Sequence, residues 1–313
     1  MMTESDPEYT RFDISPIMVY NSQKTMKKAL FLLLFLSLTC FLLSSIGCRK
    51  ASKGESPDET LKRLEQEVAR YTRAIEKNPE DAAAYNNRGG AYYSLGKYWE
   101  AISDYSKAIE LSPEVAEFYN NRGIAYKSVQ QFDRAVYDYT KSIALNPDDP
   151  LPHYNLGNIY NMTGLYREAI EAYTRAIDLN PTYSEAYGNR GISYKSTGEE
   201  DKALSDYTRA LELNPTLVLT YNNRGNIYFS RGQYEEAIAD FTKAINIDPE
   251  FALAYSGRAF TYEKTGKIRE ALADFRSFIQ SAPESYSSYI WQAEQKVKEL
   301  EGKLRENPKA PLP

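Results

Sequence analysis

The sequence has few side chains that could carry metal or nucleophilic chemistry. It contains one histidine, His153, and two cysteines, Cys40 and Cys48. A zinc site of His and Cys ligands, a disulfide scaffold and a Cys–His triad each need more of these residues. No Gly-rich phosphate loop or nucleophile elbow occurs in the sequence either. We therefore expect no catalytic residue, no metal and no cofactor, and predict that the protein is not an enzyme.

One of the two cysteines could carry a lipid. Cys48 follows an apolar run at 29–46, which begins after Lys27 and Lys28. A basic start, an apolar stretch and small residues before a cleavage point are typical of a signal peptide. The closing residues Ser45-Ile46-Gly47-Cys48 resemble the bacterial lipobox, in which the cysteine sulfur is acylated and the preceding peptide is removed.

The resemblance implies that 26–47 is a signal peptide and that Cys48 carries fatty acids such as palmitate. The protein would then be anchored in a bacterial cell envelope outside the cytoplasm, at the outer membrane if the cell is Gram-negative. An uncleaved membrane anchor is the alternative, because the run at 29–46 reaches the lower length limit of a membrane span. Residues 1–25 carry acidic side chains that do not suit a signal peptide, so we interpret them as a misassigned start or a disordered leader.

The strongest pattern in the sequence is a proline at every 34th residue. These prolines are Pro79, Pro113, Pro147, Pro181, Pro215, Pro249 and Pro283. They define six units, 82–115, 116–149, 150–183, 184–217, 218–251 and 252–285. A fixed period of this length predicts an array of one copied supersecondary unit.

Each unit has the residue pattern of two helices. Its positions 4, 8 and 11, occupied in the first unit by Tyr85, Gly89 and Tyr92, lie on one helical face. An alanine followed four residues later by an aromatic residue, as in Ala101 and Tyr105, marks a second helix. In five units a glycine separates the two halves, and a proline follows the second half in all six, so each helix has a stop signal.

This pattern resembles the tetratricopeptide repeat, a helix-turn-helix unit of 34 residues. Where the family shorthand has Trp, Leu, Gly and Tyr, the first unit has Tyr85, Arg88, Gly89 and Tyr92. The resemblance covers 82–285 and implies an all-α solenoid whose units form a right-handed superhelix. It also implies that the first helices line a concave groove that binds a protein or peptide partner.

The segments around the repeats are predicted from their composition. We expect a polar tether at 48–58, a capping helix at 59–81, a second capping helix at 286–306 and a tail at 307–313. A solenoid needs such terminal helices, because their polar outer faces keep the ends of the array soluble.

In the family, unit positions 2, 5, 6, 9, 12 and 13 face the groove. Positions 5 and 6 are rich in asparagine, whose amide can donate to and accept from an extended peptide backbone. The alternative is that these amides form hydrogen bonds between helices. The predicted partner-binding residues are Asn86, Asn87, Tyr93, Asn120, Asn121, Lys127, Asn155, Asn158, Asn161, Asn189, Lys195, Asn222, Asn223, Asn226 and Phe229.

Two charged positions change together along the array. Five units have Arg at position 7 and Asp at position 23, as in Arg190 and Asp206, whereas the third unit has Leu156 and Ala172. Loss of both charges together suggests a direct ion pair between the two helices of a unit, in a bidentate geometry. Duplication history alone would give the same pattern.

The charge balance bears on the partner class. The chain has 38 basic and 43 acidic residues and no basic block after the tether, so we expect no nucleic-acid partner. We predict a membrane-tethered extracytoplasmic scaffold that binds a protein or peptide in its groove. The alternative is a ligand-handling lipoprotein that partners the solute-binding protein of a transporter, which would need an enclosed apolar pocket.

Overall fold

The computed structural model describes residues 56–306, which form 14 α-helices and one 3₁₀-helix. The chain divides into two units, 1–51 and 52–313, and every described residue belongs to the second. The predicted signal peptide, the lipidation site Cys48 and the tail at 307–313 lie outside the described residues. Between residues 56 and 306, no helix is long and apolar enough to cross a membrane.

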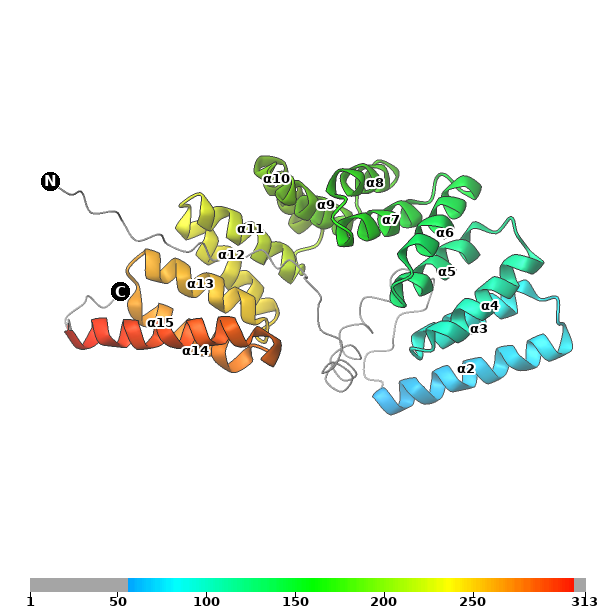
Figure 1. Cartoon of the computed structure of the whole chain (residues 1–313), viewed down its shortest axis with the longest axis horizontal. Helices are drawn as coiled ribbons and strands as arrows, with labels where there is room; N and C mark the ends of the chain where they lie inside the picture. Colours follow the sequence, from blue (N-terminus) through cyan, green and yellow to red (C-terminus); the bar gives the residue numbers. More distant parts are fainter. Residues whose placement is uncertain (1–55, 307–313) are drawn as a thin grey trace. The chain divides into compact units, whose positions relative to one another are not determined.

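Six helix pairs follow one another along this part of the chain (Figure 1). The first helices are α3 (Ala82–Ser94), α5 (Ala116–Ser128), α7 (Pro150–Met162), α9 (Ser184–Ser196), α11 (Val218–Ser230) and α13 (Ala252–Lys264). The second helices are α4 (Tyr98–Leu111), α6 (Phe132–Leu145), α8 (Tyr166–Leu179), α10 (Glu200–Leu213), α12 (Tyr234–Ile247) and α14 (Ile268–Ser281). The all-α solenoid predicted from the sequence is confirmed, and each first helix begins at the first residue of a predicted unit.

A residue in the left-handed region ends each first helix. Five of these residues are glycines with φ between 71° and 82°, and the sixth is Gln130 with φ 60°. Glycine adopts this conformation freely, whereas a residue with a side chain is strained there. The turn is nevertheless the same, because Gln131 N donates to Tyr126 O at 2.9 Å just as Lys97 N donates to Tyr92 O at 2.9 Å. The copied turn therefore tolerates the loss of its glycine.

A glycine on the first helix and a ring on the second bring the helices of a pair together. A Cβ placed on Gly89 would lie 2.8 Å from the ring of Tyr105, and one on Gly191 would lie 2.6 Å from the ring of Tyr207. Both rings are fully buried. This close approach explains why a residue with poor helix propensity recurs at unit position 8.

A helix covers each end of the array. α2 (Pro57–Lys77) packs on α3, and α15 (Ser287–Glu306) packs on α14 after a 3₁₀-helix at Glu284–Tyr286. α2 begins two residues before the predicted 59, because Ser56 and Glu59 form a capping box in which each backbone N–H donates to the other side chain.

Candidate functional site: the groove face of the first helices

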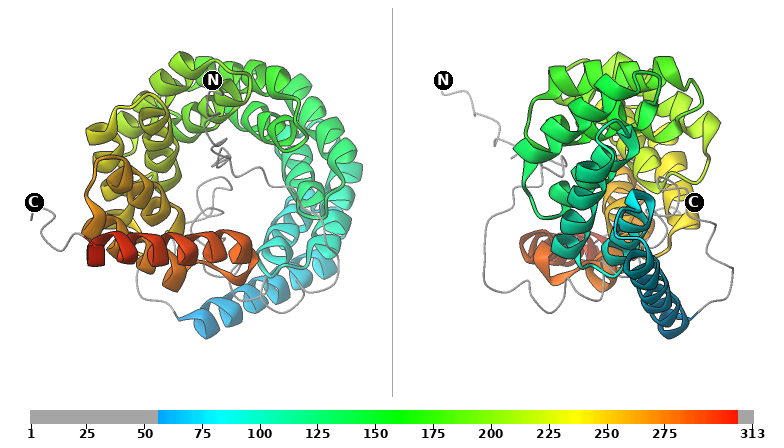
Figure 2. Two further views of the ribbon diagram at one scale, coloured as in Figure 1. Left: turned by 60° about the vertical axis from the view of Figure 1, so that its left-hand side comes forward. Right: turned by 90° about the vertical axis from the view of Figure 1, so that its right-hand side faces the viewer.

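The first helices form the inner side of the curved array (Figure 2). α3 contacts α5, α5 contacts α7, α7 contacts α9 and α11 contacts α13, whereas no two successive second helices within 56–306 pack as closely. Neighbouring elements crowd together on the inside of a curve, so these contacts place the first helices on the concave side. We call the surface at unit positions 2, 5, 6, 9, 12 and 13 of these helices the groove face.

Asparagines at unit positions 5 and 6 bridge successive first helices. Asn121 Nδ2 donates to Asn86 Oδ1 at 3.0 Å. Asn155 Nδ2 donates to Asn120 Oδ1 at 3.0 Å. Position 5 of one unit thus meets position 6 of the next, 35 residues later. All four side chains are buried, so these amides hold neighbouring units together.

The bridges do not continue to the end of the array. Asn189 Nδ2 donates instead to the hydroxyl of Tyr154 at 3.0 Å. The last two junctions have Gly188 at position 5 and Gly257 at position 6, which cannot form a side-chain bridge. Asn222 is therefore buried with its Oδ1 unpaired among the described residues.

The predicted amides of positions 5 and 6 are thus mostly not free for a partner. Asn86, Asn120, Asn121, Asn155, Asn222 and Asn223 are buried, Asn189 is half-buried and Asn87 is exposed. The alternative stated from the sequence, hydrogen bonds between helices, accounts for the paired ones. A direct role of these residues toward a partner stays a prediction.

Unit position 12 contributes a more varied row of side chains. Tyr93 is buried and its hydroxyl lies 2.9 Å from the hydroxyl of Ser128. Phe229 is half-buried, and its ring centroid is 5.9 Å from that of Tyr234. The other predicted residues of the row, Lys127, Asn161 and Lys195, are half-buried. This row, unlike the amide bridges, presents a different surface in each unit.

Behind the groove face, an ion pair joins the two helices of five units. Arg190 Nε and Nη2 donate to the two carboxylate oxygens of Asp206 at 2.7 and 2.9 Å. The other pairs have the same bidentate geometry: Arg88–Asp104, Arg122–Asp138, Arg224–Asp240 and Arg258–Asp274. The hydrogen bond with Asp104 raises the pKa of Arg88, so the pair stabilises the charged guanidinium. The bidentate pair predicted from the paired substitutions is confirmed.

Further contacts of each arginine were not predicted. Arg190 Nη1 donates to the hydroxyl of Thr174, on the second helix of the preceding unit, at 3.0 Å. The rings of Tyr187 and Tyr194 lie 5.5 and 5.6 Å from its guanidinium carbon, within the range of a cation–π contact. The sequence did hold a signal, because a Ser or Thr stands sixteen residues before each of the five arginines: Thr72, Ser106, Thr174, Thr208 and Thr242.

Comparison with family models decides what kind of repeat this is. Models described as TPR or tetratricopeptide repeats match residues 71–103, 89–130, 125–164, 150–183, 184–217, 206–239, 225–266 and 254–285. Their matches overlap and leave no gap between 71 and 285. The chain belongs to the tetratricopeptide repeat family. Proteins of this family are generally non-enzymatic interaction scaffolds that commonly bind proteins or peptides.

Solved tetratricopeptide repeat structures are similar to this chain, whereas no curated protein matches it. PilF of Pseudomonas aeruginosa is 18% identical, with a TM-score of 0.62 over 68% of this chain and 97% of PilF. YrrB, described as a TPR protein with an unusual peptide-binding site, is 29% identical, with a TM-score of 0.49 over 59% of this chain and 95% of YrrB. A chain of the Cut9–Hcn1 complex of APC/C is 17% identical, with a TM-score of 0.62 over 85% of this chain and 52% of that one. The likeness to PilF and Cut9–Hcn1 shows a shared fold.

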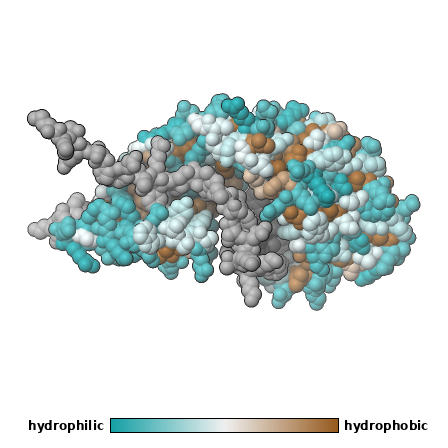
Figure 3. Space-filling view, in the orientation of Figure 1, coloured by the Kyte–Doolittle hydropathy of each residue, from teal (hydrophilic) through white to brown (hydrophobic). Residues whose placement is uncertain are grey.

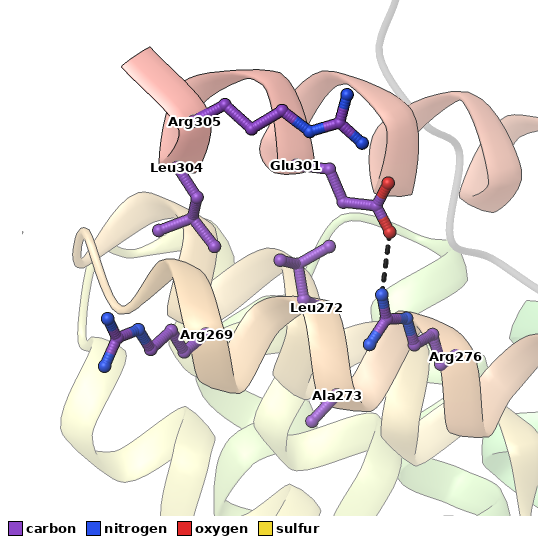
Figure 4. Close-up of a pocket in the computed structure, with 7 residues that line it drawn as sticks. All are labelled: Arg269, Leu272, Ala273, Arg276, Glu301, Leu304 and Arg305. Atoms are coloured by element: carbon purple, nitrogen blue, oxygen red, sulfur yellow. Dashed lines mark hydrogen bonds and ion pairs between the residues drawn. The ribbon is translucent and has the colours of Figure 1, made fainter. Parts of the chain in front are cut away.

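A pocket of about 470 Å³ lies away from the groove face of the tetratricopeptide array, between α14 and α15 (Figure 4). Its lining residues are Arg269, Leu272, Ala273, Arg276, Glu301, Leu304 and Arg305. Arg276 and Glu301 form an ion pair across it at 2.7 Å. An open pocket with this charged lining differs from the enclosed apolar chamber that a ligand-handling lipoprotein would need. In the view of Figure 3, apolar patches are separated by hydrophilic surface.

The hydroxyl groups of buried tyrosines on the second helices point toward the residues at unit position 9 of the first helices. Tyr173 donates its hydroxyl proton to Asn158 Oδ1 at 2.8 Å. In the second and fourth repeats position 9 is isoleucine, and the hydroxyls of Tyr139 and Tyr207 are buried without a hydrogen-bond partner in the described part of the chain. The fifth repeat has the reverse combination, since Asn226 stands at position 9 and a phenylalanine replaces the tyrosine. The Nδ2 of Asn226 is accordingly buried and unpaired within 56–306.

Removing these hydroxyls should affect stability unequally. We expect Tyr173→Phe to lower the free energy of unfolding by about 0.5–1.5 kcal/mol, because Asn158 loses a donor. Tyr207→Phe should leave the free energy of unfolding unchanged or raise it, because it removes a buried hydroxyl that has no partner. Urea denaturation of the two variants and the parent protein checks the prediction. Equal losses in both variants would contradict the assigned hydrogen bond.

Proposed function

We propose that this protein is a membrane-tethered scaffold outside the cytoplasm that binds a segment of another protein on its groove face. The fold supports the coarser part of this statement, because tetratricopeptide repeat proteins commonly bind protein or peptide partners. The tether rests on the lipobox-like sequence at Cys48 and the apolar run before it. Stable anchoring needs at least two acyl chains. A lipoprotein cysteine carries a diacylglycerol, whose two chains would hold the array at a bilayer surface.

The observation that carries the proposal is a contrast between two sets of positions. The residues that hold a repeat together, such as Gly191, Arg190 and Asp206, recur in at least five of the six units. The side chains at positions 9 and 12 of the groove face instead change from unit to unit, from Lys127 to Asn161. Packing alone would favour copies of one residue, so the variation is best explained by contact with a partner whose own sequence varies.

Site-specific crosslinking in cells tests this proposal. A photoreactive residue at Asn161, which is half-buried on α7, should give a discrete adduct with a second protein. The same residue at Tyr137, which is 57% exposed on the second helix α6, serves as the control and should give none. Equal adducts from both positions, or none from either, would contradict a groove-face partner.

The same cells test the tether. The parent protein should fractionate with membranes, and Cys48→Ser should reduce its lipid labelling below detection. Unchanged labelling with a palmitate analogue in Cys48→Ser would exclude Cys48 as the lipidation site, whereas an unlabelled parent protein that stays with membranes would favour the uncleaved anchor.

A further inference from the structure

Large apolar side chains are exposed along one edge of the array. We call it the turn edge, the side on which the first and second helices of a pair are joined by a short turn, as at 95–97, 129–131 and 163–165. Trp99 is the second residue of α4 and is 56% exposed. Met162 ends α7 and Leu165 precedes α8, so both lie at the turn of the third repeat, and they are 54% and 45% exposed.

The other repeats have polar residues at these three positions. The equivalents of Trp99 are Asp133, Arg167, Asp201, Glu235 and Arg269. The equivalents of Met162 are Ser94, Ser128, Ser196, Ser230 and Lys264, and those of Leu165 are Lys97, Gln131, Glu199, Gln233 and Lys267. The repeat therefore folds with polar side chains at all three positions. Neither packing within a repeat nor copying of the unit explains the apolar residues of the first and third repeats.

The chain enters the array at the same edge. Thr72 of α2 accepts a hydrogen bond from Arg88 at 3.2 Å. Ser106 of α4 accepts the equivalent bond from Arg122 at 3.1 Å, so α2 stacks on the first repeat as a second helix does. Every second helix begins at the turn edge, because a short turn makes it antiparallel to the first helix of its pair. The start of α2 accordingly lies on the side of the α3–α4 and α5–α6 turns (Figure 1).

α2 also extends past the other second helices at this edge. In the register given by Thr72, its residue equivalent to Tyr98, the first residue of α4, is Leu64, whereas α2 begins at Pro57. The additional residues, 57–63, add about 10 Å of helix. They include Leu61, which is 42% exposed. A fourth exposed apolar side chain thus lies on the turn edge, where the chain leads back toward Cys48.

We propose that the turn edge of the first three repeats lies against the lipid bilayer, with these four side chains in its interfacial layer. Tryptophan is enriched in that layer, because its ring is apolar and its N–H group can form a hydrogen bond. The exposed charges of these turns have both signs, since Lys97 and Arg167 are basic and Glu100 and Glu168 are acidic. Burial of apolar side chains, and not attraction to anionic lipid, therefore provides the contact.

The inference rests on the proposed tether and adds the surface that faces the bilayer. Eight residues, 49–56, separate Cys48 from α2, and a chain of this length spans at most about 30 Å. A short tether keeps the turn edge at an effective concentration in about the millimolar range near the lipid. Contacts that are too weak to bind a free protein stably are then sufficient to orient a tethered one.

The two tryptophans of the chain provide a matched test. Trp291 is 61% exposed, much like Trp99, but it lies near the start of α15, which follows the end of α14 at the opposite edge. Trp291→Phe leaves Trp99 as the only fluorescent tryptophan, and Trp99→Phe leaves Trp291. Both full-length variants are purified from membranes and reconstituted in phosphatidylcholine vesicles, with or without bromine atoms on the acyl chains. Brominated lipid should quench most of the Trp99 fluorescence and leave Trp291 unquenched. Equal quenching of both would overturn the proposal.

Substitutions taken from other repeats test whether the edge acts as a whole. Met162→Ser together with Leu165→Gln, in the Trp291→Phe background, should keep the circular dichroism spectrum of the parent protein. It should reduce the quenching of Trp99 by brominated lipid to about the level of Trp291. Leu219→Ser is the control, because Leu219 is 57% exposed at the start of α11 on the opposite edge, and it should leave the quenching unchanged. Undiminished quenching in the double variant would overturn the role assigned to the edge.

Iodide distinguishes a lipid cover from a protein cover. In vesicles, iodide in the water should quench Trp291 and leave Trp99 unquenched. If a partner protein or a second copy of this chain covers the edge, Trp99 will resist both iodide and brominated lipid. That result would overturn the proposal.

Flotation of the vesicles separates this inference from the proposed function. Protein that floats with the vesicles while brominated lipid leaves Trp99 unquenched would uphold the tether and overturn contact of the turn edge with lipid. Protein that does not float would contradict the tether itself, and with it this inference.

Discussion

Asp206→Ala is expected to lower the free energy of unfolding by about 3–5 kcal/mol, as is typical when one partner of a buried ion pair is removed. Arg190 and Asp206 are 15% and 8% exposed, so little water reaches the pair. Without the carboxylate, the guanidinium keeps its contact with Thr174 but has no counter-charge. Urea denaturation followed by circular dichroism measures the loss.

The third repeat supplies the matched control for this experiment. It has Leu156 and Ala172 in place of the pair, and the array still folds through it. Arg190→Leu together with Asp206→Ala copies that natural solution and should fall within about 1 kcal/mol of the parent protein, because well-packed apolar residues often replace a buried ion pair at little cost. A double variant as unstable as the sum of its two single variants would contradict a direct pair.

The fold could be predicted because its signals repeat and are local. Six copies of a 34-residue period determine where each helix starts and stops, and a single exception such as Gln130 changes the strain of one turn without changing its hydrogen bonds. The ion pairs could be predicted for a related reason. The paired change to Leu156 and Ala172 in the third repeat links two positions that the local spacing does not bring together.

The groove face was harder to predict, because it depends on how one repeat stacks on the next. The spacing within a helix shows that Asn86 and Asn120 share a unit position, but the bridges join position 5 of one repeat to position 6 of the next. Their burial follows from this offset and from the crowding of the first helices on the inside of the curve. Helical periodicity describes one helix at a time. It therefore predicts neither the offset between successive repeats nor the crowding of the first helices.

The same limitation applies to charges on the groove face. Lys127 and Lys195 have the same residue type and unit position, and the sequence gives both the same predicted role. In the folded array Lys195 has an interaction partner, whereas the ammonium of Lys127 has none within the described residues. Only the environment built by the neighbouring repeats distinguishes them.

A pair of adjacent glycines offers the sharpest test of the packing that holds each repeat together. Gly89→Leu should lower the free energy of unfolding by about 2–4 kcal/mol, because a Cβ there would lie 2.8 Å from the ring of Tyr105, and the larger side chain would push the two helices apart. Gly90→Leu should instead raise the free energy of unfolding by about 0.5–1 kcal/mol, because leucine has the higher helix propensity. The nearest atom to a Cβ on Gly90 is the Tyr105 hydroxyl at 3.8 Å, an ordinary contact.

The two substitutions differ by one residue along the helix and introduce the same side chain, so composition and helix propensity cancel between them. The array itself supports the expected tolerance at Gly90, since Ile124 and Ile192 occupy the same position in other repeats. Urea denaturation of both variants measures the difference in the free energy of unfolding. Similar midpoints for Gly89→Leu and Gly90→Leu would mean that the helices of a pair can separate freely, and that contact between glycine and ring does not set their spacing.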